Sequence, residues 1–199
     1  MHNRATLKAM NNPNRFHGAI ESLFTGKRER NLWRIDTLYG STYLLLLSTE
    51  KPDLTGLAEQ FGPVKSECMT KEYDTILTRV DTGTRWHFRL TANPTVSCRG
   101  EEAKRGKIRA CISTDEQRQW LKNKAVVCGF EILDQNFDIV QKEWIRFYKK
   151  DTNTKVTLLS VTYEGNLTVT DSKQFIETLC RGVGREKAYG MGLLTISGL

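Results

Sequence analysis

Apolar and polar residues follow helix-like and strand-like periods along most of this chain. After the turn-like Asn11-Asn12-Pro13, apolar residues recur every three to four positions over 14–24, which predicts a short amphipathic helix that ends at Gly26. Two strand-like runs, 32–39 and 42–47, meet at Gly40-Ser41 and predict a hairpin. The other elements predicted in the first half are a helix over 53–61 and strands over 73–80 and 85–91.

The same order of elements recurs in the second half, after a charged connector over 99–106. The predicted elements are a helix over 114–127, strands over 130–133, 138–148, 156–163 and 167–169, a helix over 172–181 and a closing strand from 193. Two rounds of helix, strand pair, helix and strand favour an α+β fold of tandem ferredoxin-like (RRM-like) domains with antiparallel sheets. We expect these domains at 1–98 and 99–199. A single α+β domain of another topology is the alternative.

A glycine-rich stretch precedes the closing strand. Residues 182–192 follow a predicted helix, whereas a dinucleotide fingerprint or a P-loop needs a strand before the glycines. Backbone N–H groups in such a loop can cradle an anion, and Arg185 and Lys187 add positive charge. We therefore predict a loop that contacts a phosphate backbone, although a plain helix-to-strand connection has the same pattern. The predicted RNA-binding positions in the loop are Gly182, Gly184, Arg185, Lys187, Gly190 and Gly192.

The overall charge favours an anionic partner. The chain has 30 Lys plus Arg against 23 Asp plus Glu, a net charge of +7, and the basic residues cluster. On the strand over 138–148, cations are interleaved with Trp144 and Tyr148, which suits RNA, while a solvated face is the common alternative. The predicted RNA-binding residues outside the glycine loop are Lys27, Arg28, Arg146, Lys149 and Lys150.

The cysteines and histidines indicate which metal, disulfide and proton-transfer chemistry the chain can support. The five cysteines are scattered without a Cys-x-x-Cys pair, as in a reduced, cytoplasmic protein. The three histidines have no metal-ligand spacing, so we expect neither a metal nor another cofactor. His17 is the best candidate for proton transfer, because the unperturbed pKa of histidine lies close to working pH. An ordinary helix-surface histidine is the alternative.

Several motifs together resemble the CasE family of CRISPR repeat-processing endoribonucleases of type I-E systems. The resemblance covers nearly the whole chain. Its motifs are Asn12-Pro13-x-x-x-His17, Arg28-Glu29-Arg30-x-Leu32-Trp33-Arg34, Phe88-Arg89-Leu90-Thr91-Ala92-Asn93-Pro94, Gly129-Phe130, Tyr163-Glu164-Gly165 and Gly182-Val183-Gly184-x-x-Lys187-Ala188-x-Gly190-x-Gly192-Leu193-Leu194.

This resemblance implies an antiviral-defence endoribonuclease that needs no metal. Such a protein binds the stem-loop of the CRISPR repeat and cuts the precursor RNA at the 3′ base of the stem, by attack of the substrate's own 2′-OH. It then stays on the guide RNA with the other subunits of the Cascade complex. The family's histidine matches His17, and its glycine-rich loop matches 182–192.

Two departures from the family pattern keep a second function open. Relatives carry a tyrosine three residues before the histidine, where this chain has Asn14, which cannot act as a base. Relatives also begin with a strand ahead of Asn3. We expect this chain to start after that strand, unless residues 5–9 form it. A non-catalytic RNA-binding subunit of the same complex is therefore the alternative function.

Overall fold

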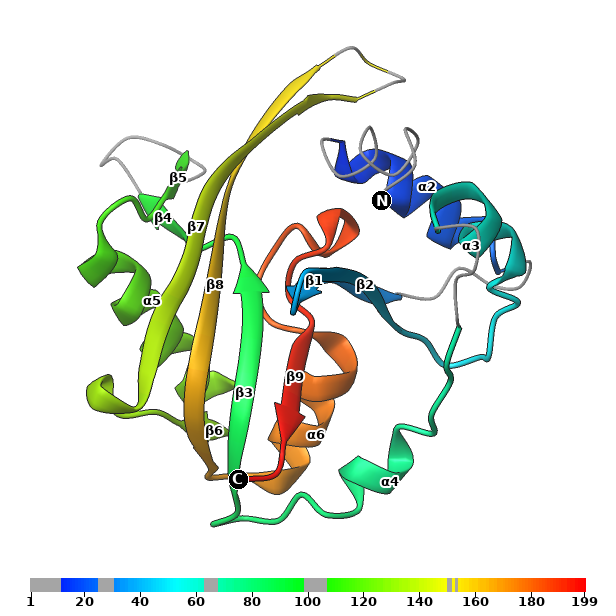
Figure 1. Cartoon of the computed structure of the whole chain (residues 1–199). Helices are drawn as coiled ribbons and strands as arrows, with labels where there is room; N and C mark the ends of the chain where they lie inside the picture. Colours follow the sequence, from blue (N-terminus) through cyan, green and yellow to red (C-terminus); the bar gives the residue numbers. More distant parts are fainter. Residues whose placement is uncertain (1–11, 25–30, 63–67, 99–106, 150–151, 153) are drawn as a thin grey trace.

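The computed structural model describes residues 12–24, 31–62, 68–98, 107–149, 152 and 154–199. Within them the fold is α+β with antiparallel sheets, as predicted (Figure 1). No helix in the described ranges is both long and apolar enough to cross a membrane.

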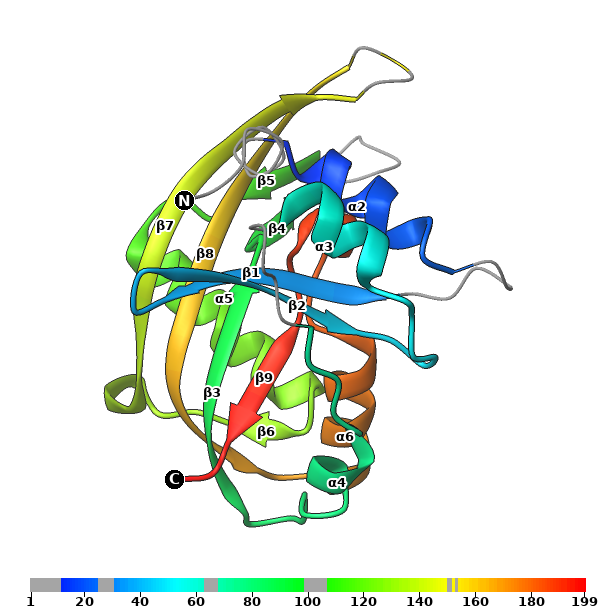
Figure 2. The same cartoon turned by 45° about the vertical axis from the view of Figure 1, so that its right-hand side comes forward.

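The main sheet has five antiparallel strands. These are β3 (Arg85–Ala92), β6 (Phe130–Glu131), β7 (Phe137–Tyr148), β8 (Lys155–Val169) and β9 (Leu194–Ser197). β3 lies between β8 and β9, and β8 also pairs with β6 and β7. Helices α5 (Thr114–Val127) and α6 (Ser172–Arg181) cover one face (Figures 1 and 2).

This sheet and its two helices form a ferredoxin-like unit that runs β3, α5, β6 and β7, β8, α6, β9. Its first strand lies between its third and its last, as that topology requires. β3 comes from residues that the sequence interpretation placed in the first domain, and it shares a sheet with strands of the second. The division at 98/99 stays a prediction.

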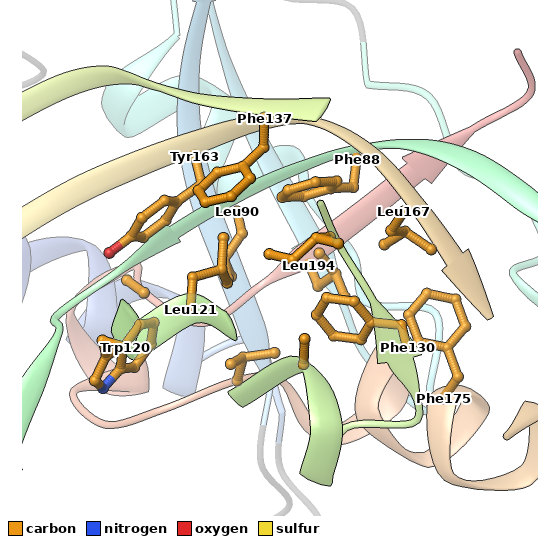
Figure 3. Packing of buried hydrophobic residues seen from close by; sticks show 14 of the residues in the cluster. Phe88, Leu90, Trp120, Leu121, Phe130, Phe137, Tyr163, Leu167, Phe175 and Leu194 are labelled. Carbon is orange, nitrogen blue, oxygen red and sulfur yellow. The ribbon is translucent and has the colours of Figure 1, made fainter. Parts of the chain in front are cut away.

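The core under the sheet follows from strict alternation along β3. Trp86, Phe88 and Leu90 are at most 4% exposed, whereas His87 and Arg89 lie on the opposite face. Figure 3 shows Phe88 and Leu90 packed among aromatic and aliphatic side chains from α5, α6 and the neighbouring strands. A Leu or Phe buried in this way contributes about 1.5–3 kcal/mol of stability.

A second, smaller layer holds the predicted hairpin. β1 (Leu32–Leu38) and β2 (Ser41–Leu47) pair in register through a turn in which Tyr39 and Gly40 both have positive φ, 50° and 78°. Positive φ at both central residues defines a type I′ turn, which matches the twist of the two strands. Helices α2 (Pro13–Glu21) and α3 (Thr55–Phe61) pack on this hairpin, with Phe16, Ile20, Trp33 and Phe61 at the centre.

The strand predicted over 73–80 was wrong. The segment contains the helix α4 (Asp74–Leu77), and Tyr73, Ile76, Leu77 and the buried Val80 pack against the main core. Their separations of three, four and seven residues are the spacing of one helix face. The β-branched and aromatic composition of the segment favoured a strand, but the spacing decided the structure.

Three smaller differences separate the structure from the predicted elements. The runs 156–163 and 167–169 are one strand, β8, which bends across the whole sheet (Figure 1). The short pair β4 (Thr95–Cys98) and β5 (Lys107–Ala110) was not predicted. The first helix ends at Glu21, before Gly26. Two 3-10 turns, η1 (Asp134–Asn136) and η2 (Lys187–Tyr189), complete the described elements.

Candidate functional site

The predicted glycine loop is a closed and largely packed element. It leaves α6 at Gly182 and enters β9 after Leu193. The backbone N–H of Val183 donates to Gly192 O (2.8 Å), and the N–H of Gly192 donates to Thr91 O (2.7 Å). The two ends of the loop are thus fastened to each other and to the main sheet.

Packing explains why glycine is needed at two loop positions. Gly190 has φ +79°, and a Cβ built there would lie 2.7 Å from the ring of Trp33 on β1. Gly192 has φ +89°, and its Cβ would lie 2.6 Å from Val183 O. L-amino acids with a Cβ rarely adopt such φ values. Gly190 and Gly192 are buried, and Gly182 and Gly184 are half-buried. Direct RNA contact by these four glycines stays a prediction.

The two loop cations have different surroundings. Arg185 is exposed, whereas Lys187 is half-buried at the start of η2 and has an interaction partner of its own. Burial raises the pKa of the Cys128 thiol, and the charge of Lys187 is among the smaller effects that lower it. Lys187 therefore lies near the protein body, and Arg185 is the loop cation most open to a ligand.

His17 lies on a helix that packs directly against this loop. Asn12 caps α2 by accepting a hydrogen bond from the N–H of Asn14 (3.2 Å), and Pro13 occupies the first turn. Phe16 and Ile20 are buried on either side of His17 in sequence, and α2 contacts η2 of the glycine loop. The structure thus brings the helix that carries the predicted proton-transfer residue against the predicted loop, which is more than 160 positions away in the sequence.

The surroundings of His17 leave its imidazole within reach of a ligand. Its side chain is 24% exposed, and its Nδ1 lies 4.0 Å from Oε1 of Glu21, one turn later. Asn14, one turn earlier, is half-buried on the same helix. A partly exposed imidazole with a nearby carboxylate can accept or donate a proton.

The predicted basic strand forms the far end of the β7–β8 hairpin. β8 pairs with β3 only over 161–168, so β7 and β8 continue together beyond the sheet (Figures 1 and 2). Arg146 and Lys149 are exposed there, with Trp144 and Tyr148 45% and 56% exposed. We call this region, residues 142–149 at the end of β7, the hairpin end.

The opposite face of the hairpin end packs on the glycine loop. Phe147 is 4% exposed, and its ring centroid lies 4.8 Å from that of Tyr189 in η2. Met191 and Leu158 complete this small cluster. One loop therefore supports both α2 and the hairpin end. Of the other predicted RNA-binding residues, Lys27, Arg28 and Lys150 lie outside the described residues.

A charged network between the two layers was missed by the sequence interpretation. Arg34 and Asp36 on β1 are 2% and 5% exposed, and Asp36 faces Arg89 of the main sheet, which also pairs with Glu164. The available signal was the placement of two opposite charges two residues apart in an apolar strand, which puts them on the same face. Both Arg34 and Arg89 also lie in motifs of the family resemblance.

Comparisons with known proteins identify the family. A family model described as CRISPR associated protein matches residues 1–197. The chain belongs to this family. The CRISPR-associated endoribonuclease Cse3 of Thermus thermophilus is 31% identical over 208 residues, which cover 98% of this chain and 94% of the relative.

Solved structures of the family share the fold. Thermus thermophilus Cse3, bound to an RNA representing a pre-cleavage complex, superposes with a TM-score of 0.77 at 27% identity, covering 98% of this chain and 93% of that one. Cas6e of Escherichia coli K-12 gives 0.56 at 22% identity, covering 94% and 92%, and supports the fold alone. The predicted tandem ferredoxin-like architecture is confirmed.

Proposed function

We propose that this protein is a metal-independent endoribonuclease that binds the stem-loop of a CRISPR repeat and cuts the precursor RNA at the 3′ base of the stem. The observation that carries this proposal is the packing of α2, with His17, against the glycine loop, with Arg185 and Lys187. The names of its relatives, an endoribonuclease and the same enzyme bound to RNA, support the reaction class.

The chemistry requires two proton transfers and stabilisation of negative charge. The 2′-OH loses its proton and attacks the adjacent phosphorus, and the 5′ oxygen leaves with a proton, so that the products carry a 2′,3′-cyclic phosphate and a 5′-OH. His17 takes the proton-transfer role, because histidine is the side chain best suited to general acid–base catalysis. The cations of the glycine loop offset the charge that develops on the phosphate. Asn14 can orient a group by hydrogen bonding but cannot accept the proton.

The hairpin end serves as the RNA-binding arm. A-form RNA has a deep, narrow major groove, so duplex RNA is recognised mostly by shape, phosphates and 2′-OH groups. Arg146 and Lys149 present positive charge on an extended arm, and Trp144 and Tyr148 add surfaces on which bases or riboses can pack. After cleavage, the stem stays bound through this arm, and the protein becomes a subunit of the Cascade complex.

A single substitution separates this function from its alternative. General acid–base help contributes about 10² to 10⁴ in rate. We therefore expect His17→Ala to lose cleavage of cognate repeat RNA by that factor under single-turnover conditions, with nearly unchanged RNA affinity.

Gln119→Ala is the matched control, since Gln119 is an exposed helix residue that also faces a partner one turn later, Asn123. If His17→Ala cuts at the parental rate, His17 is not catalytic. If the parent protein binds the repeat and never cuts it, the non-catalytic RNA-binding subunit favoured by Asn14 is the correct function.

A further inference from the structure

Arg34 is the most completely hydrogen-bonded charged side chain in the described part of the chain. Its Nε and one Nη2 hydrogen donate to the two carboxylate oxygens of Asp36, at 2.9 and 2.8 Å. The other Nη2 hydrogen reaches Thr195 Oγ1 at 2.8 Å, and Nη1 donates to Arg89 O at 2.9 Å and Leu193 O at 2.8 Å. All five N–H donors of the guanidinium are therefore used in one buried site.

Apart from Asp36, the side-chain and backbone partners of Arg34 belong to a different layer from Arg34 itself. Arg34 and Asp36 lie on β1, whereas Arg89 and Thr195 lie on β3 and β9 of the main sheet. Asp36 also faces Arg89, whose Nε lies 3.3 Å from Asp36 Oδ1. Arg89 in turn donates to Glu164 Oε2 (2.6 Å), so positive and negative groups alternate across the contact between the layers.

This network is attached to the end of the glycine loop. Leu193, whose carbonyl accepts from Arg34, directly follows Gly192. Trp33, next to Arg34 on β1, packs on Gly190. Two successive residues of β1 therefore hold the same loop, Trp33 by ring contact and Arg34 by a hydrogen bond, while α2 rests on the hairpin that contains β1.

We propose that Arg34, oriented by Asp36, is a positioning residue that fixes the glycine loop relative to α2 and so sets the position of His17 against the loop cations. This inference rests on the proposed function, since it names what holds that site together. Arginine is needed because its rigid fork binds the carboxylate in a bidentate manner and reaches three further acceptors. A lysine would keep the charge beside Asp36 but could not bond both the carboxylate and the loop carbonyl in fixed directions.

The energetics of a buried ion pair indicate that Arg34 and Asp36 fix the position of the loop and add little to the stability of the protein. Desolvation of two charges offsets most of their attraction, so apolar residues of similar size often stabilise a protein equally well. What apolar residues cannot reproduce is a directional bond to Leu193 O. Catalytic rates are sensitive to such placement, because an error of about 1 Å costs about 10² in rate.

The test compares Arg34→Lys with Arg118→Lys. Arg118 on α5 is a matched control, because it also donates to two backbone carbonyls beside carboxylates, Asp134 O and Phe137 O, which belong to the segment before and at the start of β7 and not to the glycine loop. In the absence of RNA, we expect Arg34→Lys to speed amide hydrogen exchange in peptides covering 182–193 and to leave those of α5 unchanged. With cognate repeat RNA, we expect single-turnover cleavage to fall about 10²-fold while the Kd changes by less than about threefold. Arg118→Lys should change neither the loop exchange nor the cleavage rate.

Unchanged exchange of the loop together with parental cleavage by Arg34→Lys would overturn the proposal. If Arg34→Lys does not fold, Asp36→Asn takes its place, because it keeps an oxygen acceptor and the side-chain shape while removing the charge that orients Arg34. Failure of the parent protein to cleave RNA would count against the proposed function alone, since the exchange measurement needs no substrate and still tests the positioning.

Discussion

The glycine loop and the hairpin end were predicted to bind RNA for similar reasons, yet they are built differently. The loop, 182–192, is packed by α2, by Trp33 of β1, by Phe147 of β7 and by Trp120 of α5. The hairpin end, 142–149, is exposed on the face that carries Arg146 and extends beyond the main sheet (Figure 2). The loop supports the elements packed on it, whereas the hairpin end presents an exposed surface.

This difference shows that the glycine pattern of the loop and the cation pattern of the hairpin end have different physical causes. The loop glycines are spaced where neighbouring atoms leave no room for a Cβ, so their pattern reflects packing as well as any ligand. On the hairpin end, cations alternate with Ile145 and Phe147, which pack inward on Met191 and Tyr189. Substitutions of the packed loop glycines should therefore change stability first, and those of the exposed cations in the hairpin end should change RNA affinity alone.

The largest expected effect is that of Gly190→Ala. The new Cβ would meet the ring of Trp33 at 2.7 Å, at a φ of +79°. Overpacking and left-handed strain together predict a loss of about 2 to 4 kcal/mol in the free energy of unfolding, measured by urea denaturation. Gly56→Ala in α3 is the control, since no atom lies within 4 Å of its Cβ, and it should be neutral or stabilise by up to about 1 kcal/mol. Equal stability of the two variants would show that the loop is not packed as described.

The double variant Arg146→Ala, Lys149→Ala should have a smaller effect, which changes RNA affinity and leaves stability nearly unchanged. Both side chains are exposed, so the free energy of unfolding should change by less than about 0.5 kcal/mol. Binding to a repeat hairpin should weaken, and the slope of log K against log salt should become shallower by about 1.5, since each lost phosphate contact removes about 0.7 to 0.9. The parent should prefer the RNA hairpin strongly over DNA of the same sequence. Equal affinity for RNA and DNA would reduce the hairpin end to a general polyanion binder.

The smallest expected effect belongs to Arg185→Ala in the loop. Arg185 is the exposed loop cation, so its loss should remove one contact and lower the salt slope by about 0.7 to 0.9, with stability unchanged. Adding Lys187→Ala should weaken binding further. An unchanged slope for the double variant would mean that the loop only connects α6 to β9 and supports its neighbours.

Local elements could be predicted from the sequence because local patterns determine them. The helix α5 begins where predicted, since Ser113 accepts from the N–H of Glu116 and Glu116 accepts from the N–H of Ser113, a capping box. The hairpin of β1 and β2 was equally clear from two apolar runs around Gly40. Segment 73–80 was predicted as a strand, whereas its apolar residues have the spacing of one helix face.

The long-range arrangement could not be predicted in the same way. No local pattern indicates that β3 pairs with β8 and β9 and so begins the second unit. The contact between α2 and the glycine loop depends on the packing of two layers, and so does the burial of Arg34. His17 and the loop were each identified separately, whereas the network that joins their supports became visible only in three dimensions.

The most direct test of the central claim is cleavage of the cognate repeat RNA by the parent protein in EDTA, with and without a single 2′-deoxy substitution at the nucleotide before the cut. The account predicts that unmodified RNA is cut without added metal to give a 2′,3′-cyclic phosphate and a 5′-OH. It also predicts that the 2′-deoxy RNA is bound with the same affinity and left intact. Cleavage of the 2′-deoxy RNA, or cleavage that EDTA abolishes and magnesium restores, would contradict it.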